Sequence, residues 1–132
     1  AGARLGYLIA DPAVIDALRL VRLPYHLSAI TQAAATAALG HHEVMLQMVD
    51  DIRSQRDRLV TALTDMGYSV SPSVANFVLF HGVNDPASTF QALLDRGVLV
   101  RDVGIPGALR VSAGTEEETT AFLDALAAIE QK

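Results

Sequence analysis

The stretch from His41 to Met66 constrains the possible folds of this chain more than any other part of the sequence. Apolar side chains recur in it at three- and four-residue steps, the spacing of one helix face; they are Met45, Met48, Ile52, Leu59, Leu63 and Met66. Gly67 follows, as is typical after a helix end. A helix this long more often bridges two cores than belongs to a single small one. We therefore expect a β-α-α segment over residues 1–40, a linking helix over 41–66 and a small α/β domain over 67–132.

Local signals predict the remaining elements. Alternating apolar residues indicate strands, and residues that cap helices, such as Asp, Ser or Thr before a helix and Gly after it, mark the helix ends. Thr115 and Glu118 also have the spacing of a capping box. The predicted strands cover residues 4–10, 68–70, 76–81, 98–101 and 108–113, and the predicted helices begin at Pro12, Ala29, Pro86 and Glu116.

Composition excludes several classes of protein. The net charge is −5 at pH 7, and no basic run alternates with aromatic residues, so nucleic acid is not an expected partner. The apolar runs are too short to cross a membrane, and no secretory signal pattern occurs. Cysteine is absent, which excludes disulfides, thiol nucleophiles and zinc–thiolate sites. The histidines lack the spacing of metal ligands. We expect a cytoplasmic α/β protein without a metal, a nucleic-acid partner or a membrane partner.

The positive charges of the chain are almost all arginines, and the sole lysine is Lys132. Guanidinium groups suit planar anions and anions with several oxygens. Arg4, Arg101 and Arg110 lie in or beside predicted strands, where a charge must reach solvent, a partner or a ligand. Each also has a structural interpretation: a surface position or salt bridge for Arg4 and Arg110, and a local ion pair with Asp102 for Arg101. The residues alone leave these alternatives open.

Two polar or aromatic residues are weaker candidates for a binding site. Tyr25 lies in a predicted connector, where its ring and hydroxyl could line a cleft, and Asn76 begins an apolar strand, which it could also simply terminate. The sequence contains no nucleophile–base–orienter set and no glycine-rich phosphate loop. The pattern therefore favours anion binding over nucleophilic catalysis by the residues of this chain.

Five motifs in order give the sequence a family resemblance. It resembles the C-terminal part of the fold-type-I aminotransferases that use pyridoxal 5'-phosphate, and within them most of all the histidinol-phosphate aminotransferases. The resemblance covers the whole chain, and its motifs are "AGARLGY", "LPYHLS", "ANFVLF", "GVLVRDVG" and "LRVSAGT". It implies that residues 1–40 are the C-terminal end of the large cofactor-binding domain, followed by the linking helix and the small α/β domain. It also implies that the chain is a C-terminal fragment.

The resemblance assigns roles residue by residue. It implies that the Schiff-base lysine lies upstream of Ala1, so that no catalytic residue is expected within the chain. Arg4 would bind the cofactor phosphate. Arg110 would grip the α-carboxylate of the amino-acid substrate, and Arg101 would meet an anionic group at its distal end. Tyr25 and Asn76 lie in matching motifs and would belong to the substrate site.

The implied activity is transfer of the amino group of glutamate to imidazole-acetol phosphate, a step of histidine biosynthesis, by a homodimeric enzyme acting on small amino acids and 2-oxo acids. One alternative is another activity on the same fold, either an aromatic-amino-acid aminotransferase or a decarboxylase of a phosphorylated amino acid. A second alternative is a non-catalytic α/β module that binds a small anion.

Overall fold

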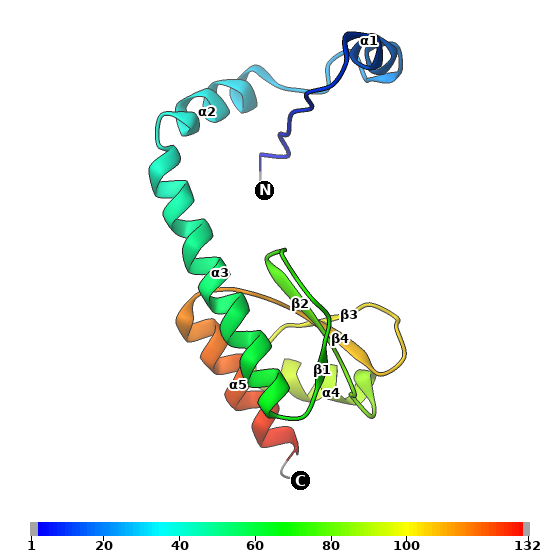
Figure 1. Ribbon diagram of the computed structural model, residues 1–132, viewed down its shortest axis with the longest axis vertical. Helices are drawn as coiled ribbons and strands as arrows, with labels where there is room; N and C mark the ends of the chain where they lie inside the picture. The colour runs from blue at the N-terminus through cyan, green and yellow to red at the C-terminus, as the bar shows by residue number, and fades with distance from the viewer. Residues whose placement is uncertain (1–2, 131–132) are drawn as a thin grey trace. The chain divides into compact units, whose positions relative to one another are not determined.

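The computed structural model describes residues 3–130 and contains both helices and strands (Figure 1). The elements, in chain order, are α1 (Pro12–Val21), α2 (Ala29–Leu39), α3 (His42–Asp65), β1 (Ser69–Val70), β2 (Phe77–His81), α4 (Pro86–Leu94), β3 (Arg101–Asp102), β4 (Ala108–Ser112) and α5 (Glu116–Glu130). The chain divides into two compact units, Ala1–Met45 and Leu46–Lys132. Within the described residues, none of the helices combines the length and the apolarity that a membrane span requires.

Helices α1 and α2 form where their caps predict them. The Asp11 carboxylate accepts a hydrogen bond from the Ala13 amide at 2.9 Å and begins α1. The Ser28 hydroxyl accepts one from the Thr31 amide at 3.0 Å and begins α2. Each side chain pairs an amide that has no partner within the helix. The prediction of both helix starts is confirmed.

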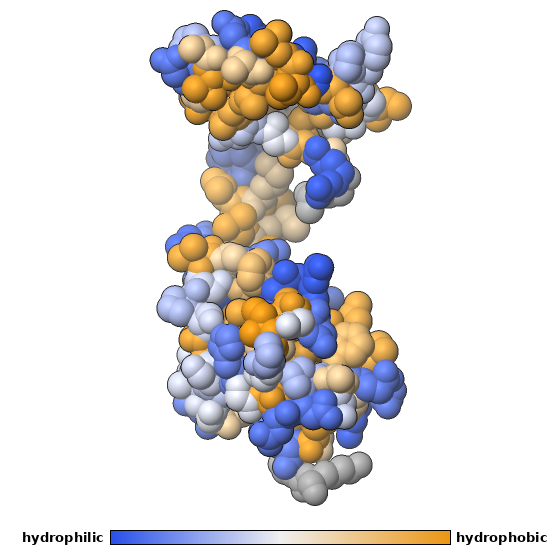
Figure 2. Space-filling view, turned by 90° about the vertical axis from the view of Figure 1, so that its right-hand side faces the viewer, coloured by the Kyte–Doolittle hydropathy of each residue, from blue (hydrophilic) through white to orange (hydrophobic). Residues whose placement is uncertain are grey.

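The strand predicted over residues 4–10 is wrong. These residues form no regular element, and Tyr7 and Ile9 are 91% and 85% exposed. A strand exists only where its backbone groups pair with a neighbouring strand, and residues 3–45 contain no strand. None of these described residues is buried, and their apolar side chains form orange areas on the surface of this unit (Figure 2).

The unit that begins at residue 46 contains a sheet and an apolar core. The four strands are all antiparallel and lie in the order β1-β2-β4-β3. In the longest pairing, Phe77 lies opposite Ser112 and Leu79 lies opposite Arg110. Strands were predicted at all four places, although β1, β2 and β4 are slightly shorter than predicted.

The prediction of a strand over 98–101 is correct only at its end, because β3 begins at Arg101. The Val98 amide donates to the Leu93 carbonyl at 3.0 Å and so belongs to the C-terminal cap of α4. Gly97 makes this turn possible with a φ of +77°, a conformation that costs glycine little. The amide directly after Gly97 therefore caps α4 and does not pair with the sheet.

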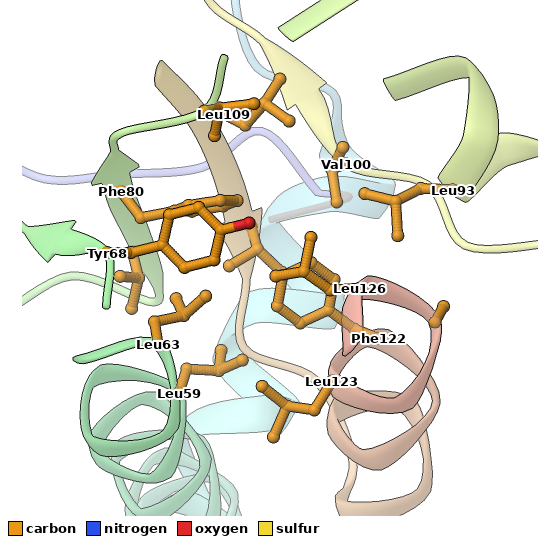
Figure 3. Close-up of a cluster of buried hydrophobic side chains, with 14 of the residues drawn as sticks. Leu59, Leu63, Tyr68, Phe80, Leu93, Val100, Leu109, Phe122, Leu123 and Leu126 are labelled. Carbon is orange, nitrogen blue, oxygen red and sulfur yellow. The ribbon is translucent and has the colours of Figure 1, made fainter. Parts of the chain in front are cut away.

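One side of the sheet packs against helices. Leu59 and Leu63 of α3, Phe122 and Leu126 of α5 and Phe80 of β2 meet in a single buried cluster (Figure 3). The ring of Phe80 makes edge-to-face contacts with Tyr68 and Phe122, with centroids 5.2 Å and 6.1 Å apart. Such pairs stabilise a core beyond the area they bury. Helices α3 and α5 therefore cover one face of the sheet through a packed apolar core.

Helices α3 and α5 are also joined by polar contacts. The Arg58 guanidinium of α3 donates to the Thr120 hydroxyl at 2.8 Å and to the Glu116 carbonyl at 3.3 Å, both on α5. The predicted capping box of α5 is confirmed: the Thr115 amide donates to the Glu118 carboxylate at 2.8 Å, and the Glu118 amide donates to the Thr115 hydroxyl at 3.2 Å. Helix α3 is continuous from His42 to Asp65, as its apolar period predicted, whereas the domain boundaries proposed from the sequence stay a prediction.

Candidate anion-binding site

The register of the sheet brings two predicted site residues together. Arg101 of β3 lies directly opposite Arg110 of β4, and directly opposed residues of antiparallel strands point to the same face. Arg110 in turn lies opposite Leu79, so this face carries the half-buried Leu79 and Phe77 of β2. It is the face opposite to the one that Val78 and Phe80 bury in the core.

An open hollow of about 480 Å³ lies at these arginines. Its walls combine two guanidinium groups and one carboxylate with apolar side chains and one hydroxyl. The residues that line it are Phe90, Leu99, Val100, Arg101, Asp102, Arg110 and Ser112. This composition suits a small molecule that carries an anionic group and an apolar or aromatic part.

Neither arginine is neutralised by the part of the chain that the structure describes. Among residues 3–130 the ion pairs are Arg19–Asp16, Arg53–Asp50 and Arg56–Asp57. The carboxylate of Asp102 accepts a hydrogen bond from the Gly104 amide at 2.8 Å instead, so the structure does not form the local ion pair considered for Arg101. Two like charges opposed across strands destabilise a sheet, and an anion between them would remove that cost.

Arg110 has an unusual environment for a charged side chain. Its guanidinium carbon lies 4.7 Å from the centre of the Phe77 ring, a typical cation–π arrangement. Its Nε atom is buried and has no hydrogen-bond partner among the described residues. A buried donor without a partner is rare in folded proteins and is explained where a ligand completes the site.

Arg4 lies in the other unit and is also exposed. Its φ of 51° is in the left-handed region that non-glycine residues seldom adopt. It forms no ion pair within the described residues. Backbone conformations of this kind concentrate at ligand-binding positions, and an unpaired guanidinium matches the oxygens of a phosphate group. The chemistry of Arg4 thus fits the cofactor phosphate that the family resemblance assigns to it.

Tyr25 belongs to the other unit, and Asn76 belongs to the unit of the opposed arginines but does not line their hollow. Tyr25 is 99% exposed, in the turn that follows Pro24. Asn76 lies just before β2, where its carbonyl accepts a hydrogen bond from the Ala113 amide at 2.9 Å and extends the ladder by one pair. Asn76 is exposed and does not line the hollow. Their roles in substrate binding therefore stay predictions.

Sequence reasoning missed two aromatic residues of the site. Phe77 lies against Arg110, and Phe90 of α4 lines the hollow. The sequence predicted a strand at Phe77 and a helix at Phe90, which is correct, but gave neither residue a binding role. The alternation of β2 places Phe77 on the face opposite to Phe80, so the pattern could have shown that Phe77 lies outside the core.

Away from the arginines, the buried polar groups among the described residues include the Thr119 hydroxyl, which has no hydrogen-bond partner there, and the Tyr68 phenol. The Tyr68 hydroxyl donates to the Glu130 carboxylate on α5. Burial, together with this carboxylate, raises the pKa of Tyr68 above the usual range of a phenol. The described residues contain no group of histidines and carboxylates that could hold a metal ion.

Comparison with known proteins gives this site a context. Residues 1–126 match the family model described as aminotransferase class I and II. The chain is 63% identical, over 98% of its length, to histidinol-phosphate aminotransferase of Paenarthrobacter aurescens. It spans about a third of the length of the curated relatives it matches, with 35%, 34% and 32% of three of them covered.

Two solved structures share the fold. Histidinol-phosphate aminotransferase from Sinorhizobium meliloti, in complex with pyridoxal-5'-phosphate, matches 98% of the chain and 37% of its own, at 29% identity and a TM-score of 0.78. L-threonine-O-3-phosphate decarboxylase from Porphyromonas gingivalis matches 99% of the chain and 43% of its own, at 23% identity and a TM-score of 0.81. The second likeness concerns the fold alone. The α/β fold predicted from the sequence is confirmed.

Proposed function

We propose that this chain, which belongs to the aminotransferase class I and II family, supplies the anion-binding residues of a histidinol-phosphate aminotransferase. The identity to curated proteins of that name supports the assignment. The observation that carries it is the opposed pair of Arg101 and Arg110, which line one hollow and have no acidic partner among the described residues.

The proposed reaction moves an amino group from glutamate to imidazole-acetol phosphate and yields 2-oxoglutarate and histidinol phosphate. Pyridoxal phosphate, when bound, supplies the electron sink for this transfer. Arg4 holds the phosphate of the cofactor, since its guanidinium is exposed and free of ion pairs within residues 3–130. The resemblance assigns the covalent attachment of the cofactor to a lysine outside residues 1–132.

The two sheet arginines bind and orient the substrates. Arg110 forms a two-pronged hydrogen-bonded pair with the α-carboxylate of glutamate. Arg101 meets the second anionic group, which is the side-chain carboxylate of glutamate or the phosphate of histidinol phosphate. Since both arginines line the same hollow, a phosphate dianion also offsets their mutual repulsion. Tyr25 and Asn76 complete the substrate site in this proposal, and the enzyme acts as a cytoplasmic homodimer.

The test uses a full-length protein that contains residues 1–132. Arg101→Ala should lower kcat/KM for histidinol phosphate by about tenfold or more, the loss expected for a charge-assisted hydrogen bond. The same variant should lower kcat/KM for phenylalanine, which lacks the phosphate, by much less. Arg96→Ala is the matched control, because Arg96 is an exposed arginine in the turn after α4, and its guanidinium donates to the Ala92 carbonyl.

Each alternative gives a different result in this assay. Equal losses for both substrates would assign Arg101 a structural role. Turnover of phenylalanine only, or release of carbon dioxide from a phosphorylated amino acid, would indicate another activity on the same fold. A non-catalytic module would show no turnover and no change in the absorbance of added pyridoxal phosphate.

A further inference from the structure

The side chain of Arg110 is held by an aromatic ring and not by an acid. Phe77 and Arg110 lie on the same sheet face, two positions apart along the β2–β4 ladder, because Phe77 pairs with Ser112 and Leu79 pairs with Arg110. Diagonal neighbours of this kind are within reach of aromatic and long side chains. The guanidinium carbon accordingly lies 4.7 Å from the centre of the ring.

The other contacts that usually fix an arginine are missing in the described part of the chain. Arg110 has no carboxylate within ion-pair distance among residues 3–130, and its buried Nε has no hydrogen-bond partner there. The residue opposite it is Arg101, whose like charge disfavours any orientation that brings the two guanidinium groups together. Within the described residues, the attractive contact of the Arg110 guanidinium is therefore the one with the Phe77 ring.

An aromatic ring restrains a guanidinium differently from a carboxylate. A carboxylate occupies the N–H groups with which arginine recognises an anion. A ring attracts the cation through its face and leaves those N–H groups free to form hydrogen bonds. A guanidinium restrained in this way remains available to a planar anion and loses less side-chain freedom when the anion binds.

We propose that Phe77 is a positioning residue for Arg110, holding its guanidinium ready for the carboxylate of the substrate. This inference rests on the proposed function, because it takes Arg110 as the carboxylate-binding residue. Phe77 acts on binding through Arg110 and has no part in the chemical step.

The test compares variants of the full-length protein with glutamate as substrate. Phe77→Leu should raise KM for glutamate by about 3- to 30-fold, the range expected for one cation–π contact, and should change kcat less than twofold. Phe77→Tyr keeps a ring and should restore KM to within about twofold of the original. Phe77→Met removes the ring at similar volume, and it replaces Phe77→Leu in the comparison if the leucine variant does not fold.

A double-mutant cycle separates positioning from a general structural effect. In an Arg110→Gln background, Phe77→Leu should change KM by less than twofold, because the group that it positions is gone. An equal rise of KM in both backgrounds would overturn the positioning role. If Arg110→Gln raises KM but Phe77→Leu does not, the positioning role is overturned and the proposed function stands. If Arg110→Gln leaves KM unchanged, the proposed function itself fails.

Discussion

Removing the charge of Arg101 should make its sheet more stable, although it should impair binding. Arg101 and Arg110 are directly opposed, and with roughly 6 Å between charges on such side chains, Coulomb's law in water gives about 0.7 kcal/mol of repulsion. Screening reduces this to about 0.6 kcal/mol at 10 mM salt and about 0.3 kcal/mol at 150 mM salt. Arg101→Gln should therefore stabilise residues 46–132 by about 0.6 kcal/mol at low salt.

Thermal unfolding of residues 46–132, followed by circular dichroism, measures this effect. A gain of about 0.6 kcal/mol corresponds to a rise of roughly 3 °C in Tm for a domain of this size, and the rise should shrink as salt is added. Arg96→Gln removes the same charge from the turn after α4 and is the control. The whole chain has a net charge of −5, so loss of an arginine should on average be destabilising. A Tm for Arg101→Gln that is equal to or below that of the original at 10 mM salt would refute the reasoning.

Three further predictions follow from burial, titration and charge. Leu63→Ala should cost about 3 kcal/mol in urea unfolding, because Leu63 is 0% exposed and its truncation leaves a cavity, whereas Leu94→Ala, at a site 42% exposed, should cost far less. Since the pKa of Tyr68 is raised in the folded state, the folded chain keeps a proton that the unfolded chain loses, so stability should fall as pH rises above about 10. Tyr68→Phe should flatten this dependence, and an unchanged pH profile would contradict it. Arg4→Ala should weaken pyridoxal phosphate binding to the full-length protein by about 1–3 kcal/mol; an unchanged dissociation constant in a cofactor titration would return Arg4 to a structural role.

The helices could be predicted from the sequence because their signals are local. Asp11, Ser28 and Thr115 cap helices with their own side chains, and apolar residues recur on helical spacing in both halves of α3. Strands depend on distant partners, so alternation alone was insufficient. It failed for residues 4–10, where the described unit offers no partner strand, and for Val98, whose amide caps α4.

The candidate site was predictable in residue type but not in arrangement. Arginines near strands, in a chain whose positive charges are almost all arginines, pointed to anion binding. That Arg101 faces Arg110 depends on the register between β3 and β4, which no local pattern specifies. The stacking of Phe77 on Arg110 depends in turn on the register between β2 and β4.

Steady-state transamination by a full-length protein containing residues 1–132 tests the central claim most directly. With 2-oxoglutarate as acceptor, kcat/KM is measured for histidinol phosphate and for phenylalanine. The account predicts a value at least about tenfold higher for histidinol phosphate, because only that substrate presents a phosphate to Arg101 and Arg110. An equal or higher value for phenylalanine, or no transamination of histidinol phosphate, would contradict it.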